Sequence, residues 1–151
     1  MNGADITKTR GMFLLGCRAE IGIRAEAERI WDLLTDAKNY PNWNSMVLGI
    51  DGTIREGQRL RIRVPGTGRT FSPIVRDLVP NRRMKWVGGV PGVFRGVRTF
   101  ELSPRVDGST VFMMEERFTG LMLLFVKSSM PDFGPVFGQW ASNLKEAAER
   151  N

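Results

Sequence analysis

Histidine is absent from this chain of 151 residues, and cysteine occurs only once. Without an imidazole, nucleophile systems of the Ser-His-Asp and Cys-His kinds are excluded, and so are ordinary histidine-ligated metal sites. The single Cys17 can form neither an internal disulfide nor a paired-cysteine metal site. We therefore expect no metal, no cofactor and no catalytic residue, and a reducing, cytoplasmic location.

Long apolar runs are also missing. The longest is "GLMLLFV" over residues 120–126, far short of the roughly 20 residues that span a bilayer. Hydrophobic residues make up 42% and charged residues 25% of the chain, which is ordinary for a globular protein. A chain of this length fits one domain. We expect this single domain over 12–151, preceded by a flexible N-terminal segment over 1–11.

The charge is strongly positive, with a formal net charge of +6. Lysines and arginines are scattered along the chain and form no basic tail, so we interpret them as a solvated surface and expect no nucleic-acid partner. Peripheral contact with an anionic membrane stays open, and the sequence does not specify an oligomeric state.

Apolar periodicity predicts the order of the elements. Alternation over 13–23, with Cys17 facing inward, is typical of a half-buried strand, and residues 25–35 have the spacing of a short helix. The aromatic turn "NYPNWNSM" follows, and then about six strands separated by short turns that suit an antiparallel meander. One of these strands is expected over 69–79, "RTFSPIVRDLV". In "QRLRIRV", Arg59, Arg61 and Arg63 alternate with apolar residues, so they should line a solvated sheet face.

The C-terminal part returns to helical spacing. Met130, Phe133, Phe137, Trp140 and Leu144 recur every three or four residues, as on one face of a long helix. Because Pro135 lies inside or at the start of this stretch, we expect a bend between a short piece from about 121 and a main helix that ends near 150. This helix is the only element long enough to cover the apolar face of the sheet.

The ordered set "AERIWDLLTDAKNYPNWNSMV", "FSPIVRDLVPNRRMKWVGG", "FRGVRTFELSP" and "GSTVFMMEERFTGLM" resembles the START-like helix-grip superfamily, in particular its polyketide cyclase/dehydrase and lipid-transport (SRPBCC) branch. The resemblance implies an α+β helix-grip fold: a curved antiparallel sheet of about six to seven strands wrapped around a long C-terminal helix, with two short helices after the first strand. It makes residues 12–151 a START-like ligand-binding domain.

The resemblance implies a hydrophobic small-molecule partner, such as a lipid, polyketide or aromatic compound, held between the sheet and the C-terminal helix. Two alternatives remain: a polyketide or aromatic cyclase that acts in the same cavity, and an interaction module that binds a protein or an anionic surface through the basic sheet face. The expected ligand-binding residues are Trp43, Met46, Ile62, Phe71, Trp86, Arg98, Phe100, Met114, Glu116, Phe118, Phe133, Phe137 and Trp140.

Arg98 and Glu116 are the only charged residues in this set. Each shares the parity of large apolar residues on its strand, and the turn "SPRVDGS" joins the two strands as a hairpin. We therefore expect them to meet inside the domain, because either charge buried alone would cost several kcal/mol. A permanently charged arginine cannot carry a proton, which favours binding over cyclase chemistry.

Overall fold

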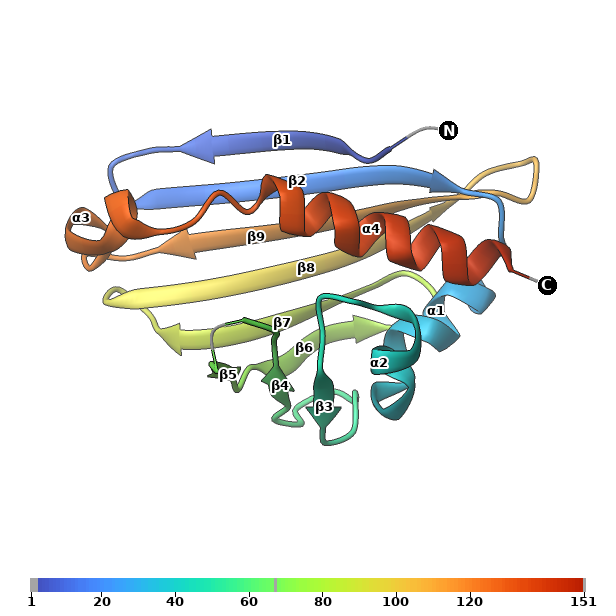
Figure 1. The fold of residues 1–151 in the computed structure, drawn as a ribbon, viewed down its shortest axis with the longest axis horizontal. Coiled ribbons are helices and arrows are strands. Elements are labelled where there is room, and N and C mark those ends of the chain that lie inside the picture. Colours follow the sequence, from blue (N-terminus) through green and yellow to red (C-terminus); the bar gives the residue numbers. More distant parts are fainter. Residues whose placement is uncertain (1–2, 67, 151) are drawn as a thin grey trace.

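The computed structural model describes residues 3–66 and 68–150. Six strands form one antiparallel sheet in the order β1-β2-β9-β8-β7-β6. They are β1 (Asp5–Arg10), β2 (Leu14–Ile23), β6 (Ile74–Val79), β7 (Arg83–Val90), β8 (Phe94–Pro104) and β9 (Thr110–Thr119). The long α4 (Gly134–Glu149) lies along one face of this sheet, as Figure 1 shows, so the helix-grip architecture expected from the sequence is confirmed.

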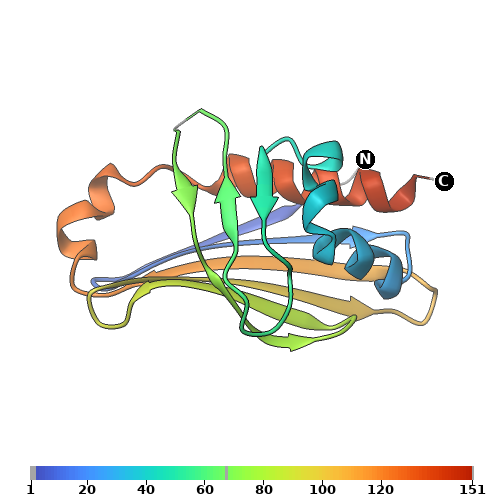
Figure 2. The ribbon, with the colours of Figure 1, turned by 90° about the horizontal axis from the view of Figure 1, so that it is seen from below.

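Three short strands pair separately. They are β3 (Gly49–Asp51), β4 (Arg61–Arg63) and β5 (Thr70–Phe71), in the order β3-β4-β5. In Figure 2 they run across the long strands. The amide of Leu60 donates to the carbonyl of Pro73, and that of Val75 donates to Gln58, so the small sheet is tied to the edge of the large one beside β6.

Short helices connect the two sheets. These are α1 (Ala27–Thr35), the 3-10 turn η1 (Ala37–Asn39) and α2 (Tyr40–Trp43). Pro41 lies in the first turn of α2, where a missing N–H costs nothing.

Near the C-terminus, α3 (Leu123–Val126) and the 3-10 turn η2 (Lys127–Ser129) precede α4. No helix in the described part of the chain is long and apolar enough to cross a membrane.

One core joins the helices α1, α2 and α4 to the sheets. Helix α1 contributes Ile30 and Leu34, and the sheet contributes Ile21, Phe100 and Phe112, all of them buried. The alternation seen in the sequence thus puts even positions of β8 and β9 and odd positions of β2 against α4. The aromatic turn folds back into this core, since Tyr40 and Trp43 are both buried.

The structure differs from three expectations. Residues 5–10 of the segment expected to be flexible form β1; none of them is buried, so the strand has no apolar periodicity and depends on pairing with β2. The strand expected over 69–79 is split at Pro73, which has no N–H to donate, and its halves belong to different sheets. Met130 and Phe133 precede the C-terminal helix, because α4 begins only at Gly134, with Pro135 in its first turn.

Candidate functional site

A row of cross-strand partners crosses the inner face of the sheet near the start of α4. Register pairing aligns Trp86 with Arg98, Arg98 with Glu116, Glu116 with Cys17, and Cys17 with Lys8. Side chains directly opposite each other on one face lie close enough to interact. The row therefore brings an indole, a guanidinium, a carboxylate, a thiol and an ammonium group together from five different strands.

Arg98 and Glu116 form an ion pair at the centre of this row. The Nε of Arg98 donates to Oε2 of Glu116 at 3.3 Å, and the two side chains are 25% and 14% exposed. The guanidinium also lies over the ring of Phe137, with Cζ 5.2 Å from the ring centroid. The contact expected from strand parity is confirmed, and it lies under the first turn of α4.

The electrostatics of the row follow from burial. Desolvation raises the pKa of Glu116, and the charge and hydrogen bond of Arg98 offset part of that rise. Burial likewise raises the pKa of the Cys17 thiol, so this cysteine is held in its neutral form and is no activated nucleophile. Glu116 is the one carboxyl group in the row, and its raised pKa makes it easier to protonate than an ordinary glutamate.

In the next inward-facing row, the positions on β7 and β8 are glycines and therefore carry no side chain. Gly88 and Gly96 are register partners, and Gly96 also pairs with Phe118. A Cβ atom placed on Gly96 would lie only 3.2 Å from the Phe118 ring, so this ring rests directly over the glycine backbone. Phe118 stacks on Phe94 at 5.6 Å and contacts Phe133 at 5.4 Å. These three half-buried rings, Phe94, Phe118 and Phe133, are called the aromatic mouth below.

Beyond the ion pair, aromatic rings fill the space between the sheet and α4. Trp140 on α4 contacts Tyr40, Trp43, Phe100 and Phe112, with ring centroids 5.4 to 6.0 Å apart. Trp86 packs on Phe100 at 4.7 Å. The Tyr40 hydroxyl donates to the carbonyl of Leu34 at 2.7 Å, and burial raises the pKa of this tyrosine well above its usual value. The interior next to the helix is thus packed with rings.

Three buried indole groups in this interior lack a hydrogen-bond partner. The Nε1 atoms of Trp43, Trp86 and Trp140 contact no acceptor among the described residues. Leaving a buried donor unpaired costs about 1 to 3 kcal/mol, and buried tryptophan usually finds a partner for its N–H. Trp86 is the most informative of the three, because its register partner is Arg98.

The residues expected at the site fall into three groups. Trp43, Ile62, Trp86, Phe100, Met114, Phe137 and Trp140 are buried in the core, and Met46, Arg98, Glu116, Phe118 and Phe133 are partly buried. Phe71 departs from the pattern: it lies on β5 in the small sheet and is 51% exposed. Ile62 is its cross-strand partner there, so these two lie on the small sheet and outside the row under α4.

Sequence reasoning missed several residues of this region. Gly88 and Gly96 share the inward parity of Trp86 and Arg98, and that parity was the available signal. The inward position of Phe94 could likewise be predicted from the parity of its strand. The position of Lys8 could not, because nothing in the sequence indicates that β1 pairs with β2. That pairing brings the ammonium group of Lys8 to within 2.7 Å of Asp132.

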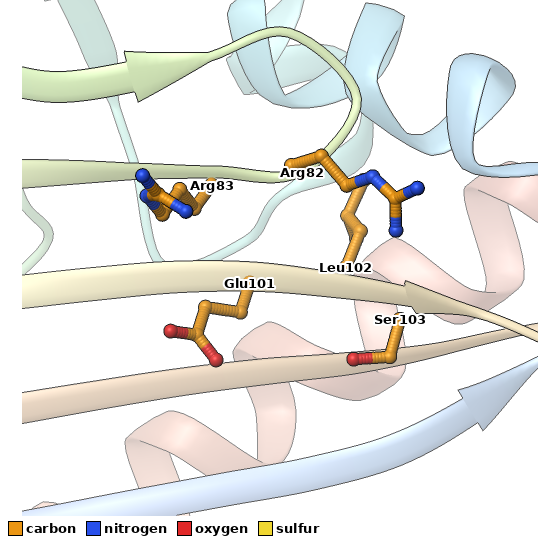
Figure 3. Close-up of a pocket in the computed structure, with 5 residues that line it drawn as sticks. All are labelled: Arg82, Arg83, Glu101, Leu102 and Ser103. Atoms are coloured by element: carbon orange, nitrogen blue, oxygen red, sulfur yellow. The ribbon is translucent and has the colours of Figure 1, made fainter.

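A hollow of about 210 Å³ lies elsewhere, lined by Arg82, Arg83, Glu101, Leu102 and Ser103. Figure 3 shows these side chains along β8 and the start of β7. Glu101 and Ser103 have the parity opposite to the buried Phe100 and Leu102, so the hollow opens on the outer side of the sheet. It offers charged groups of both signs and little apolar surface, unlike the inner row.

The exposed arginines of the small sheet form a second charged surface. Arg59, Arg61 and Arg63 are exposed while Leu60 and Ile62 are buried, so the expected basic sheet face is present. Arg59 donates from Nη1 to the carbonyl of Ser72 at 2.8 Å. This contact gives at least one of the three guanidinium groups a structural role.

An antiparallel sheet wrapped over a long C-terminal helix defines the START-like helix-grip class. The chain belongs to the family described as polyketide cyclase/dehydrase and lipid transport, whose model matches residues 17–149. No curated protein matches the chain.

Solved structures agree on the fold. A protein from Mesorhizobium loti has a TM-score of 0.70 at 21% identity, with 90% of this chain and 98% of that one covered. CalU16 from Micromonospora echinospora has a TM-score of 0.68 at 17% identity, covering 97% and 87%. A START superfamily protein from Mycobacterium smegmatis has a TM-score of 0.58 at 20% identity, covering 89% and 94%. At these identities the likeness concerns the fold alone.

Proposed function

We propose that this protein binds a small apolar molecule that carries a hydrogen-bond acceptor, held between the sheet and the first turns of α4. The observation that carries the proposal is the unpaired, buried N–H of Trp86, whose register partner Arg98 forms the ion pair with Glu116. A ligand carbonyl or hydroxyl oxygen placed there would accept from the indole, and a guanidinium offers further donors beyond the Nε used on Glu116.

The aromatic mouth supplies the apolar part of this site. Gly88 and Gly96 raise no side chain from β7 and β8, and the partly exposed Phe118 ring covers Gly96. Rotation of Phe118 would expose a flat strip of backbone bounded by Phe94 and Phe133, and a planar ligand can stack there. Membership of a family described by cyclase and lipid-transport activities supports an apolar ligand.

The test uses two molecules of the same shape, fluorenone and fluorene, which differ in one carbonyl group. Isothermal titration calorimetry should show that fluorenone binds more tightly, by about the 0.5 to 1.5 kcal/mol that one neutral hydrogen bond contributes. Trp86→Phe, which keeps a ring and removes the N–H, should bring the two affinities together. Trp31→Phe is the matched control, because Trp31 is also buried but lies on α1, and it should leave the difference unchanged.

Two results would overturn the proposal. One is the absence of binding of either compound by the folded protein. The other is a preference for fluorenone that persists in both Trp86→Phe and Arg98→Met, since the acceptor would then be recognised elsewhere.

Catalysis is a second candidate, favoured by one observation. Burial raises the pKa of Glu116, and a carboxyl group with a raised pKa is better suited to act as a general acid, with Arg98 able to polarise a neighbouring carbonyl. A linear poly-β-ketone incubated with the protein would then lose water on ring closure, detected by mass spectrometry, and Glu116→Gln would abolish that loss. Recovery of the unchanged compound from the intact protein would leave binding as the function.

A further inference from the structure

One end of the molecule is formed by three turns that present apolar side chains to solvent. The β1–β2 turn exposes Met12 and Phe13, the β7–β8 turn exposes Val90 and Val93, and the segment after β9 exposes a further four. Figures 1 and 2 both place α3 at this end, where β1 ends and β8 begins. We call the set the apolar end: Met12, Phe13, Val90, Val93, Leu121, Met122, Leu124 and Phe125.

Backbone hydrogen bonds hold the three turns together. The amide of Gly120 donates to Phe13, and the amides of Leu121 and Met122 donate to Gly92 and Val93, at 3.0 and 2.9 Å for the last two. The Lys127 ammonium donates to the carbonyl of Gly11 at 2.7 Å. The exposed side chains therefore belong to one organised surface. Phe125 is 77% exposed and Leu124 is 52% exposed, which is costly for side chains of this size unless they meet an apolar partner.

Cations outnumber acids around this surface. Residues 6–19, 88–100 and 117–131 contain seven lysines and arginines and no aspartate or glutamate. Three of the seven pair with acids just outside these ranges. The four that form no ion pair among the described residues are Arg10, Arg95, Arg117 and Lys127. Among these, Arg10 is an exposed residue at the end of β1, and Arg117 is exposed near the end of β9. Cations bordering an apolar tip complement a negatively charged surface whose interior is apolar.

We propose that the apolar end docks on a membrane containing anionic lipids, with Leu124 and Phe125 inserted among the acyl chains and the bordering cations at the phosphates. A second copy of the chain fits less well, because the four cations at its own apolar end that form no ion pair would face these. Acyl chains rearrange around an irregular set of protruding side chains, whereas a rigid partner needs a complementary surface. The aromatic mouth lies next to this end, since Phe94 follows Val93 and Phe118 lies two residues before Gly120. Docking would bring the mouth against the bilayer.

The experiment is flotation of the full chain with vesicles of phosphatidylcholine alone or mixed with phosphatidylglycerol. The chain should bind the mixed vesicles, more weakly as salt is raised because surface charges are screened. The double change Leu124→Ser with Phe125→Ser should weaken that binding by roughly a hundredfold or more, since each inserted apolar side chain contributes at least about tenfold. Its melting curve should match that of the unchanged protein, because both side chains are exposed.

Two control variants locate the surface. Val106→Ser changes a fully exposed apolar residue in the β8–β9 turn, at the other end of the strands. Arg61→Gln with Arg63→Gln removes two of the three positive charges of the basic sheet face. Both should bind the mixed vesicles as the unchanged protein does, and amide hydrogen exchange should slow over 120–126 when these vesicles are added.

Four outcomes would overturn the proposal. They are no binding to mixed vesicles, equal binding to both vesicle types, loss of binding in the arginine variant alone, and a dimer in analytical ultracentrifugation that the Leu124 and Phe125 changes abolish. The last would assign the apolar end to self-association.

Discussion

At Glu116, two electrostatic effects oppose each other: burial favours the neutral acid, and Arg98 favours the carboxylate. The net pKa lies above the ordinary value of 4.5. The stability contributed by this group is therefore present below that value and is lost as the pH rises through the folded-state pKa. Glu116 thus makes the fold slightly less stable at neutral pH than in mild acid, and Arg98 limits that loss.

Arg98→Met should increase the stability that Glu116 costs the fold at neutral pH, because without the guanidinium the folded-state pKa of Glu116 rises further. We expect a destabilisation of roughly 1 to 3 kcal/mol at pH 7. This destabilisation should shrink well below pH 4.5, where Glu116 is protonated in both the folded and the unfolded state. Denaturant titrations at the two pH values measure it.

Two further variants test the interpretation of that result. The double change Arg98→Met with Glu116→Leu should recover much of the lost stability, because no buried charge is left unpaired. Arg18→Met removes an exposed pair with Glu20 and should cost no more than about 1 kcal/mol. A pH-independent effect of Arg98→Met would mean that the guanidinium does not influence Glu116.

Among the elements, α4 depends most on a single side chain. Trp140 contacts rings from α2, β8 and β9, so it anchors the helix to the short helical segment and to the sheet at once. Trp140→Ala should lower the free energy of unfolding by roughly 3 to 5 kcal/mol, measured by urea titration. Val136→Ala on the exposed side of the same helix, where the side chain is 42% exposed, should change it by less than about 1 kcal/mol. Similar effects of the two changes would contradict this anchoring role.

Elements with a buried face could be predicted from the sequence, and those without one could not. The alternation over 13–23 predicted β2 because Cys17, Ala19, Ile21 and Ile23 meet the core. Strand β1 has six exposed or partly exposed residues, so its structure comes from hydrogen bonds to β2, which leave no trace in hydrophobic periodicity. Pro73 could be recognised in the sequence as a residue that interrupts a strand. That the two halves of this strand join different sheets could not be predicted, because it depends on where the small sheet lies.

The candidate site shows the same limit. Strand parity was enough to bring Arg98 and Glu116 together, because a hairpin fixes which residues face each other. Strand parity does not determine how far an aromatic ring extends from its strand. It therefore could not predict that the rings of Trp140, Phe100 and Phe112 meet in the space that was expected to hold a ligand. The unpaired indole groups were equally hidden, since hydrogen bonding depends on the orientation of each ring.

At the scale of the whole molecule, stability should fall from the middle of the large sheet outward. Strands β2, β9 and β8 are neighbours in the sheet and among its longest strands, whereas β1 is an edge strand with no buried residue. Regions with few buried contacts open most readily. Hydrogen exchange followed by mass spectrometry should therefore find the slowest amides in β8, β9 and β2, and faster exchange in β1 and over 120–129. Equal protection of β1 and β8 would contradict this gradient.

The packing of the interior also has an optical consequence. All four tryptophans, Trp31, Trp43, Trp86 and Trp140, are buried, so the indole fluorescence of the folded protein should lie to the blue of that of the unfolded chain. Trp86 lies one inward-facing row from Phe118 of the aromatic mouth, and Trp43 and Trp140 touch edge to face. A molecule that entered between the sheet and α4 would therefore change the emission of several indoles at once. The protein thus carries its own spectroscopic reporter at the place where a ligand is expected, and it needs no added label.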